Sequence, residues 1–452
     1  MTVAQSIHVP AVINEKKVGA FQYQVVAMCG LVMFLDGFDT QAISYMAPLI
    51  AREWNLRPGM LGPIFSSALA GLMVGYLVLA PLSDRFGHRR MLIVSTVTFG
   101  LLTLVTIAAG SATQLMTLRF LTGMGLGAAI PSAVALTGEY SPRRLRASFV
   151  LAIYCGFSLG FVAAGMAAAY LLPVYGWRSL LWVGSVAPLA LAIVLFFRLP
   201  ESLDFLVRNG ASHQRIRSLL CRVDPRLATA PEAAGYTTDR EQSRTMASGV
   251  LRSGRRAGTF LLWFVFIINL AEFYALQSWL PTVLTNLGYS ISTVALATSL
   301  TTTGGIVAAF IVGPAMDRIG YYAPLAVVYA AGATFVALTG AVLAGPEWAL
   351  LATTFWAGFC VSGGQKSVIA LSAVFYPAPV RSTGVGWALG IGRIGGIGGP
   401  LLFGLLLGRQ FTPASVFYMA AMPMLLAAGA IMVMGWLYSS RRKGRRHRDA
   451  EA

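Results

Sequence analysis

Long apolar segments alternate with short polar ones along almost the whole chain. A run of about 20 apolar residues is long enough to cross the hydrocarbon core of a bilayer as a helix. The pattern therefore predicts twelve membrane-spanning helices, at 21–50, 60–82, 91–110, 113–138, 148–172 and 177–199, and then at 258–285, 291–316, 323–344, 348–376, 382–407 and 413–438.

A polar stretch divides these helices into six and six, and an even number of crossings places both termini on the same side of the membrane. The sequence predicts five parts: an N-terminal segment at 1–20, a six-helix bundle at 21–199, a linker at 200–257, a second six-helix bundle at 258–438 and a basic tail at 439–452.

The two halves resemble each other in sequence. The run Pro81–Gly87 recurs as Pro314–Gly320, an offset of 233 residues, and at the same offset Asp39 corresponds to Glu272. We therefore predict an all-α polytopic membrane protein built from two six-helix bundles. A parallel repeat of this kind is expected to place a substrate site at the interface of the halves, near the middle of the bilayer.

The charge pattern orients these helices. Only 11% of the residues are charged, whereas soluble domains carry about 25%. The net charge of +17 comes from basic residues in short runs between apolar segments, which is the positive-inside pattern. It assigns the termini and the linker to the cytoplasm. The run Arg441–Arg446 fits a tail beside anionic lipid better than a nucleic-acid site.

No catalytic chemistry is evident in the sequence. The four cysteines are far apart, the four histidines lie in tails or polar loops, and there is no phosphate-binding loop and no Ser/His/Asp set. We therefore expect neither an enzyme nor a bound metal or cofactor. The energy for any uphill work would come from an ion gradient.

Two carboxylates interrupt the first apolar segment, Asp36 and Asp39. Each costs roughly 3 kcal/mol or more at the centre of a bilayer, and residues three apart lie on one face of a helix. The pair predicts handling of protons, ions or a polar solute. The alternative is a structural contact to a neighbouring helix. For proton coupling we name Asp36, Asp39 and Glu272, with Asp39 as the main carrier.

Several motifs resemble those of a known family. Asp84–Arg90 is similar to the signature between helices 2 and 3 of the major facilitator superfamily, although Ala80 or Pro81 stands where that signature begins with glycine. Arg119–Gly127 resembles its helix 4 signature. Asp36–Thr40 resembles the helix 1 motif of its aromatic acid:proton symporters of the benzoate and 4-hydroxybenzoate type.

This resemblance implies a monomeric transporter in a bacterial inner membrane, with an aromatic carboxylate and protons as partners. Such a substrate needs a cation and apolar walls. Arg393, flanked by glycines that allow close approach, is the predicted carboxylate clamp. Arg119 either pairs with an acid such as Asp36 or takes part in coupling. The remaining candidates for the ring and its hydroxyl groups are Phe38, Tyr154, Phe273, Tyr274 and Gln365.

The resemblance also implies a cytoplasmic gate. Asp84 lies where a carboxylate can accept hydrogen bonds at a helix N-terminus or pair with Arg143, Arg144 or Arg146. The gating residues are expected to be Asp84, Gly87, Arg89 and Glu139, with Asp317, Arg318 and Arg381 in the second half.

Two other functions fit the same features. A drug:proton antiporter of the superfamily would share the Asp84 loop, but the cation at Arg393 argues against a cationic drug. A membrane sensor of aromatic acids would bind without transport, although the linker is short for a signalling domain.

Overall fold

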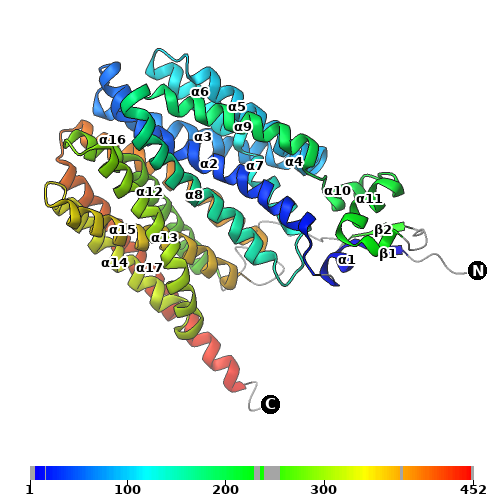
Figure 1. Cartoon of the computed structure of the whole chain (residues 1–452). Helices are drawn as coiled ribbons and strands as arrows, with labels where there is room; N and C mark the ends of the chain where they lie inside the picture. Colours follow the sequence, from blue (N-terminus) through cyan, green and yellow to red (C-terminus); the bar gives the residue numbers. More distant parts are fainter. Residues whose placement is uncertain (1–5, 16, 229–234, 239–254, 377–379, 449–452) are drawn as a thin grey trace, which may run out of the picture. The chain divides into compact units, whose positions relative to one another are not determined.

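The computed structural model describes residues 6–15, 17–228, 235–238, 255–376 and 380–448 (Figure 1). Within these ranges, the side chains of 6, 80, 84, 147, 228, 381, 382 and 439–448 are outside the description. The described residues contain twelve helical spans long and apolar enough to cross a membrane, and they confirm all twelve predicted segments.

The first six spans are formed by long helices and two shorter continuations. Their bounds are α2 (Ala20–Glu53), α3 (Leu61–Val78) preceded by the 3-10 helix η1 (Pro58–Met60), α5 (His88–Thr106), α6 (Ala112–Leu126) continued by α7 (Ala129–Glu139), α8 (Arg146–Tyr175) and α9 (Arg178–Arg198). The last six are α12 (Arg256–Asn286), α13 (Ile291–Ile319), α14 (Tyr322–Ala341), α15 (Glu347–Phe375), α16 (Arg381–Gly408) and α17 (Pro413–Arg448).

Short elements connect these spans or flank them. They are β1 (Ser6–His8), α1 (Val9–Glu15), α4 (Ala80–Phe86), α10 (Leu203–Arg208), α11 (His213–Val223), the 3-10 helix η2 (Pro225–Ala228) and β2 (Gly235–Thr237).

Glycines allow close contacts between helices, and the same contacts occur in both halves of the chain. A methyl group on Gly71 of α3 would overlap the main-chain oxygen of Phe120 in α6. Gly304 of α13 meets Phe355 of α15 in the same way, at offsets of 233 and 235 residues. A second matched set, at the same two offsets, is Gly160 against Phe34 and Gly395 against Ile267. The internal repeat read from the sequence is therefore also a repeat of helix packing.

The chain forms two compact units that cut across the two sets of six helices. The first contains residues 1–40, 70–163 and 178–241, and the second contains 41–69, 164–177 and 242–452. The C-terminal part of α2, the start of α3 and the end of α8 therefore group with α12 to α17.

In the first unit, the hydrophobic core continues from the long helices into the short elements. Buried Val9 and Ile13 of α1 and Ile216 and Leu220 of α11 belong to the same cluster as Val25 of α2. Strand β1 pairs in parallel with β2 from Ser6–Gly235 to His8–Thr237. In Figure 1 these elements gather beside α10. Part of the predicted linker is thus folded against the N-terminal segment.

In the second unit, the helices pack in pairs. Helix α12 lies against α16, α13 against α15, and α14 against α17. The α12–α16 pair is close because glycines of α16 face α12, at Gly392, Gly395, Gly396 and Gly399. Small residues allow this close approach where no hydrophobic force holds helices together in lipid. This pair carries most of the candidate site residues of the second unit.

Candidate functional site

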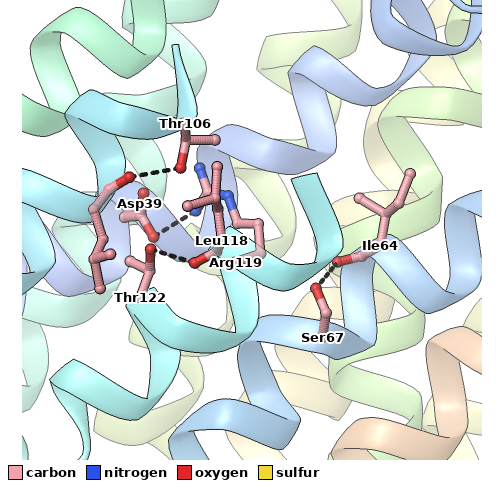
Figure 2. Close-up of polar contacts among 8 residues, drawn as sticks. Asp39, Ile64, Ser67, Thr106, Leu118, Arg119 and Thr122 are labelled. Carbon is pink, nitrogen blue, oxygen red and sulfur yellow. Dashed lines mark hydrogen bonds and ion pairs between the residues drawn. The ribbon is translucent and has the colours of Figure 1, made fainter. Parts of the chain in front are cut away.

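A buried ion pair joins α2 to α6 in the first unit. Nη1 of Arg119 lies 2.7 Å from Oδ2 of Asp39, and the two side chains are 1% and 5% exposed (Figure 2). Asp36, the acid suggested for Arg119 by the sequence, lies one turn earlier on α2 and is buried. The predicted pairing between these two spans is therefore present, and the partner of Arg119 is Asp39 instead of Asp36.

Arg119 keeps unused donors beside this ion pair. Its Nε and Nη2 are buried and have no hydrogen-bond partner among the described residues. The nearby hydroxyl of Thr122 donates to the main-chain oxygen of Leu118, as Figure 2 shows, and does not accept from the guanidinium. A buried guanidinium with two unpaired nitrogens can donate hydrogen bonds to a further anionic oxygen.

The walls beside the ion pair are apolar and close. Phe38 is buried, and a methyl group on Gly184 of α9 would lie 3.9 Å from both the Phe38 ring and Oδ1 of Asp39. Tyr154 of α8, another predicted ring contact, is 41% exposed. Phe38 therefore lies next to the charged pair, as a residue that contacts the substrate ring would need to.

Glu272 occupies the matching place in the second unit. It lies on α12 at the position equivalent to Asp39 and is 6% exposed. At the position equivalent to Arg119, by the offset of 235 residues, the chain has Thr354. Within the described residues, Glu272 makes no hydrogen bond or ion pair. The second half thus keeps the acid and lacks the cation that balances it in the first half.

Arg393 of α16 is half-buried and donates from Nη1 to the hydroxyl oxygen of Tyr274, at 2.9 Å. The Tyr274 ring packs edge-on against Phe273, with centroids 5.1 Å apart. Two of the glycines near Arg393, Gly392 and Gly395, face α12 and bring the two helices together.

Two polar residues of α15 lie in the same unit. The Gln365 side chain is half-buried and makes no hydrogen bond with any described residue. The neighbouring Lys366 donates from Nζ to the main-chain oxygen of Gly305 in α13, at 2.9 Å. Gln365 therefore has free polar atoms for a solute.

The loop that follows α4 has the same backbone as its repeat. Gly87 has φ of +95° and Gly320 has φ of +105°. A methyl group on Gly87 would lie 2.6 Å from the Glu201 carboxylate. Glycine is needed here because the backbone has a positive φ and because any side chain would overlap the Glu201 carboxylate.

Arg89 and Glu201 tie together the ends of two helices. Oε1 of Glu201 accepts from the main-chain N–H of Arg89 at 2.9 Å, near the start of α5. The Arg89 side chain donates to the main-chain oxygens of Leu199 at 2.7 Å and Phe196 at 2.5 Å, at the end of α9. An acid at a helix N-terminus and a base at a C-terminus both complement the helix dipole.

Glu201 was missed by the sequence analysis, which gave the helix N-terminus to Asp84. The available signal was a carboxylate directly after the last apolar segment of the first half. The side chains of Asp84 and Arg381 lie outside the described part of the structure.

Two neighbours extend this cluster around Glu201. The Tyr140 hydroxyl donates to the main-chain oxygen of Glu201 at 2.6 Å. Burial, and then the nearby carboxylates of Glu139 and Glu201, raise the pKa of Tyr140 well above its ordinary value, so it remains a donor. Glu139, predicted to join the gate, lies close to Ser202 in the same cluster.

The equivalent cluster in the second half is not formed among the described residues. Asp317 and Arg318 are exposed, and the Tyr321 hydroxyl donates a hydrogen bond of 3.4 Å to Asp317. The two halves share the loop backbone and differ in its side-chain contacts.

A third set of contacts lies within the second unit. Nε2 of Gln41 donates to the main-chain oxygen of Gln277 at 3.1 Å, and the Ser66 hydroxyl donates to that of Ile397 at 2.7 Å. The rings of Phe65 and Trp279 lie 5.3 Å apart. We call these residues of α2 and α3, with their partners on α12 and α16, the seal.

Comparison with known families decides the identity of the fold. The family model described as Major Facilitator Superfamily matches residues 29–338 and 262–452. The chain belongs to this superfamily.

Relatives within the superfamily agree with the resemblance seen in the sequence. The 4-hydroxybenzoate transporter PcaK of Pseudomonas aeruginosa is 37% identical over 96% of this chain and 97% of its own length. The gallate transporter of Pseudomonas putida is 34% identical over 94% of both chains. Among solved structures, the xylose transporter XylE from E. coli has a TM-score of 0.70 at 16% identity, over 93% of this chain and 98% of its own.

The capping contacts of Glu201 predict a loss of stability on substitution. Glu201→Gln removes the charge from hydrogen bonds to Arg89 and Ser202, which is expected to cost about 1–2 kcal/mol. Thermal unfolding of the detergent-solubilised protein should show a lowered midpoint. Asp204→Asn is the comparison, because its ion pair with Arg208 is partly exposed and should contribute little. Equal midpoints for Glu201→Gln and wild type would contradict the capping role.

Proposed function

We propose that this protein is a proton-coupled secondary transporter that imports aromatic carboxylic acids, such as benzoate or hydroxybenzoates, by alternating access. We place it in a bacterial inner membrane, with both termini in the cytoplasm and the monomer as the working unit. Support comes from relatives that match nearly the whole chain and are named for aromatic acid transport. The observation that carries the proposal is the buried guanidinium of Arg119, which has two open donors.

Coupling follows from competition for this guanidinium. A substrate carboxylate that binds the open donors of Arg119 weakens its attraction for Asp39. An anion buried without a counter-charge is costly, so Asp39 takes up a proton. One proton then moves with one monoanion, which is electroneutral and driven by the pH gradient. Glu272, which has no ion pair among the described residues, is a second proton carrier, and Asp36 is a third.

In the second unit, Arg393 is a separate carboxylate site, which holds the substrate at a different stage of the transport cycle from Arg119. It lies on an otherwise apolar helix and is oriented by the Tyr274 hydroxyl. Phe273 and Tyr274 provide apolar walls, and Gln365 offers free polar atoms for ring substituents. The seal is the closed state of one gate, which must open and close once in each cycle.

The direct test is uptake of labelled aromatic acids into proteoliposomes, with a pH gradient imposed and then collapsed. Concentrative uptake that disappears with the gradient is expected. Exchange that is indifferent to the gradient would remove the coupling role from the acids. No flux of any acid would favour an antiporter of cationic drugs, and binding without flux would indicate a sensor.

The seal predicts the effect of a bulky residue at Gly62. A methyl group added there would lie only 3.0 Å from the main-chain oxygen of Pro400. Gly62→Leu is therefore expected to prevent the seal from forming and to abolish exchange. Ser66→Cys, introduced in a cysteine-free background, should become reactive to a polar thiol reagent in the Gly62→Leu variant.

Gly398→Leu is the control for Gly62→Leu. It introduces the same side chain on α16, at a glycine with open space around it. Normal exchange by Gly62→Leu would show that the seal does not need to form during transport.

A further inference from the structure

Gln277 of α12 has one buried polar atom without a partner. The side chain is 3% exposed, and its Oε1 makes no hydrogen bond among the described residues. Its Nε2 donates to the hydroxyl oxygens of Thr301 at 2.8 Å and Thr302 at 3.1 Å. The amide nitrogen is therefore held by two hydrogen bonds, while the amide oxygen has no donor.

The orientation of this amide follows from the threonine contacts. The Thr301 hydroxyl donates its proton to the main-chain oxygen of Thr298, at 2.6 Å. Its oxygen can then only accept from Gln277, so the nitrogen of the amide faces Thr301. The free atom is an acceptor, and it calls for an N–H or O–H donor.

The position of Gln277 connects this acceptor to the carboxylate clamp. Tyr274, whose hydroxyl accepts from Arg393, lies three residues earlier on α12. Residues three apart lie on one helix face with about 5–6 Å between Cβ atoms. An aromatic acid whose carboxylate binds Arg393 can span that separation with its ring. Such a ring would extend from Arg393 on α16 towards the Gln277 amide, which lies against α13.

We propose that Gln277 is the specificity residue for the ring, with Oε1 accepting a hydrogen bond from a hydroxyl or amino group opposite the carboxylate. This inference rests on the proposed transport of aromatic acids. Nε2 of Gln41 donates to the main-chain oxygen of Gln277, so the seal closes over this position. In the enclosed state, the ring substituent takes the place of water as the donor.

The substituent opposite the carboxylate then determines which aromatic acid the transporter prefers. A donor opposite the carboxylate satisfies Oε1, whereas a bare ring or a methoxy group leaves it unpaired. A site built to hydrogen-bond a hydroxyl group discriminates strongly against an analogue that lacks it. We expect 4-hydroxybenzoate and 4-aminobenzoate to be preferred over benzoate and 4-methoxybenzoate by about tenfold in kcat/KM.

The first experiment uses the wild-type protein alone. Unlabelled 4-hydroxybenzoate, 4-aminobenzoate, benzoate, 4-methoxybenzoate and 3-hydroxybenzoate compete with labelled 4-hydroxybenzoate for uptake into proteoliposomes. Strong competition by the two donors alone supports the proposal. Equal competition by 4-methoxybenzoate, or a preference for the 3-hydroxy acid, overturns it. No uptake of labelled 4-hydroxybenzoate, and none of labelled benzoate in a parallel assay, overturns the proposed function as well, so the two failures are distinct.

The second experiment asks whether Gln277 is responsible. Gln277→Met keeps the length of the side chain and removes the acceptor, so the tenfold preference for 4-hydroxybenzoate over benzoate should disappear while benzoate uptake persists. Gln22→Met is the matched control, because Gln22 is equally buried and its Nε2 donates to a main-chain oxygen, that of Tyr140. A preference that survives in Gln277→Met overturns the proposal, as does an equal loss for both acids, which would indicate a structural role.

Discussion

Replacing Asp39 with Asn is expected to abolish accumulation of aromatic acids against a gradient. The substitution removes the proton-carrying group and leaves the Arg119 guanidinium buried without its 2.7 Å counter-charge. Breaking a buried pair in this way costs about 3–5 kcal/mol. Uptake into proteoliposomes with an imposed pH gradient is the measurement. Normal concentrative uptake by Asp39→Asn would exclude Asp39 as the coupling site.

A double variant separates coupling from stability. Asp39→Asn combined with Arg119→Gln removes both charges and should recover most of the lost stability, because replacing both partners of a buried pair is often nearly neutral. The thermal midpoint should therefore return towards wild type while accumulation stays absent. Recovery of both properties would show that the pair only holds α2 against α6.

Glu272→Gln is the matched variant in the second half. Because no cation pairs with Glu272 among the described residues, its neutralisation should leave the thermal midpoint unchanged or raised. A lowered accumulation ratio would then report coupling alone. An unchanged ratio would assign all coupling to the acids of α2.

The membrane helices were predictable because the bilayer sets their length and demands an apolar surface. The predicted segment at 348–376, for example, corresponds to α15 at Glu347–Phe375. The break between α6 and α7 was not predicted, since the apolar run continues through it. There Gly127 packs onto the backbone of Gly75 in α3, a contact between distant residues that hydropathy does not contain.

The sequence predicts which residues belong to the site better than it predicts which of them contact each other. A charge buried in a membrane is costly, so a charged residue within an apolar segment is a candidate functional residue. This identifies Asp39, Arg119 and Arg393. Which acid meets Arg119 depends on the relative height of two helices, and an error of one turn exchanges Asp36 for Asp39. Glu201 was missed for a related reason, because it lies outside the apolar segments where a charge is conspicuous.

Arg393→Ala is expected to weaken uptake of aromatic acids by roughly a hundredfold in kcat/KM, since hydrogen bonds to charged groups contribute about 1.5–3 kcal/mol each. Arg393→Lys keeps the charge and loses the planar fork, so it should recover only part of the activity. Initial uptake rates across a range of substrate concentrations give kcat and KM for each variant. The loss should appear mainly in KM if Arg393 binds the carboxylate in the ground state.

Two further variants test how Arg393 is held. Tyr274→Phe removes the oxygen that accepts from Arg393 at 2.9 Å and keeps the ring, so it should raise KM by less than Arg393→Ala does. Arg409→Ala, at the exposed end of the same helix, removes a cation outside the site and should leave uptake unchanged. Only a residue that binds the carboxylate directly predicts three different effects for these variants. An equal effect of Arg393→Ala and Arg409→Ala would show that Arg393 contributes only general positive charge.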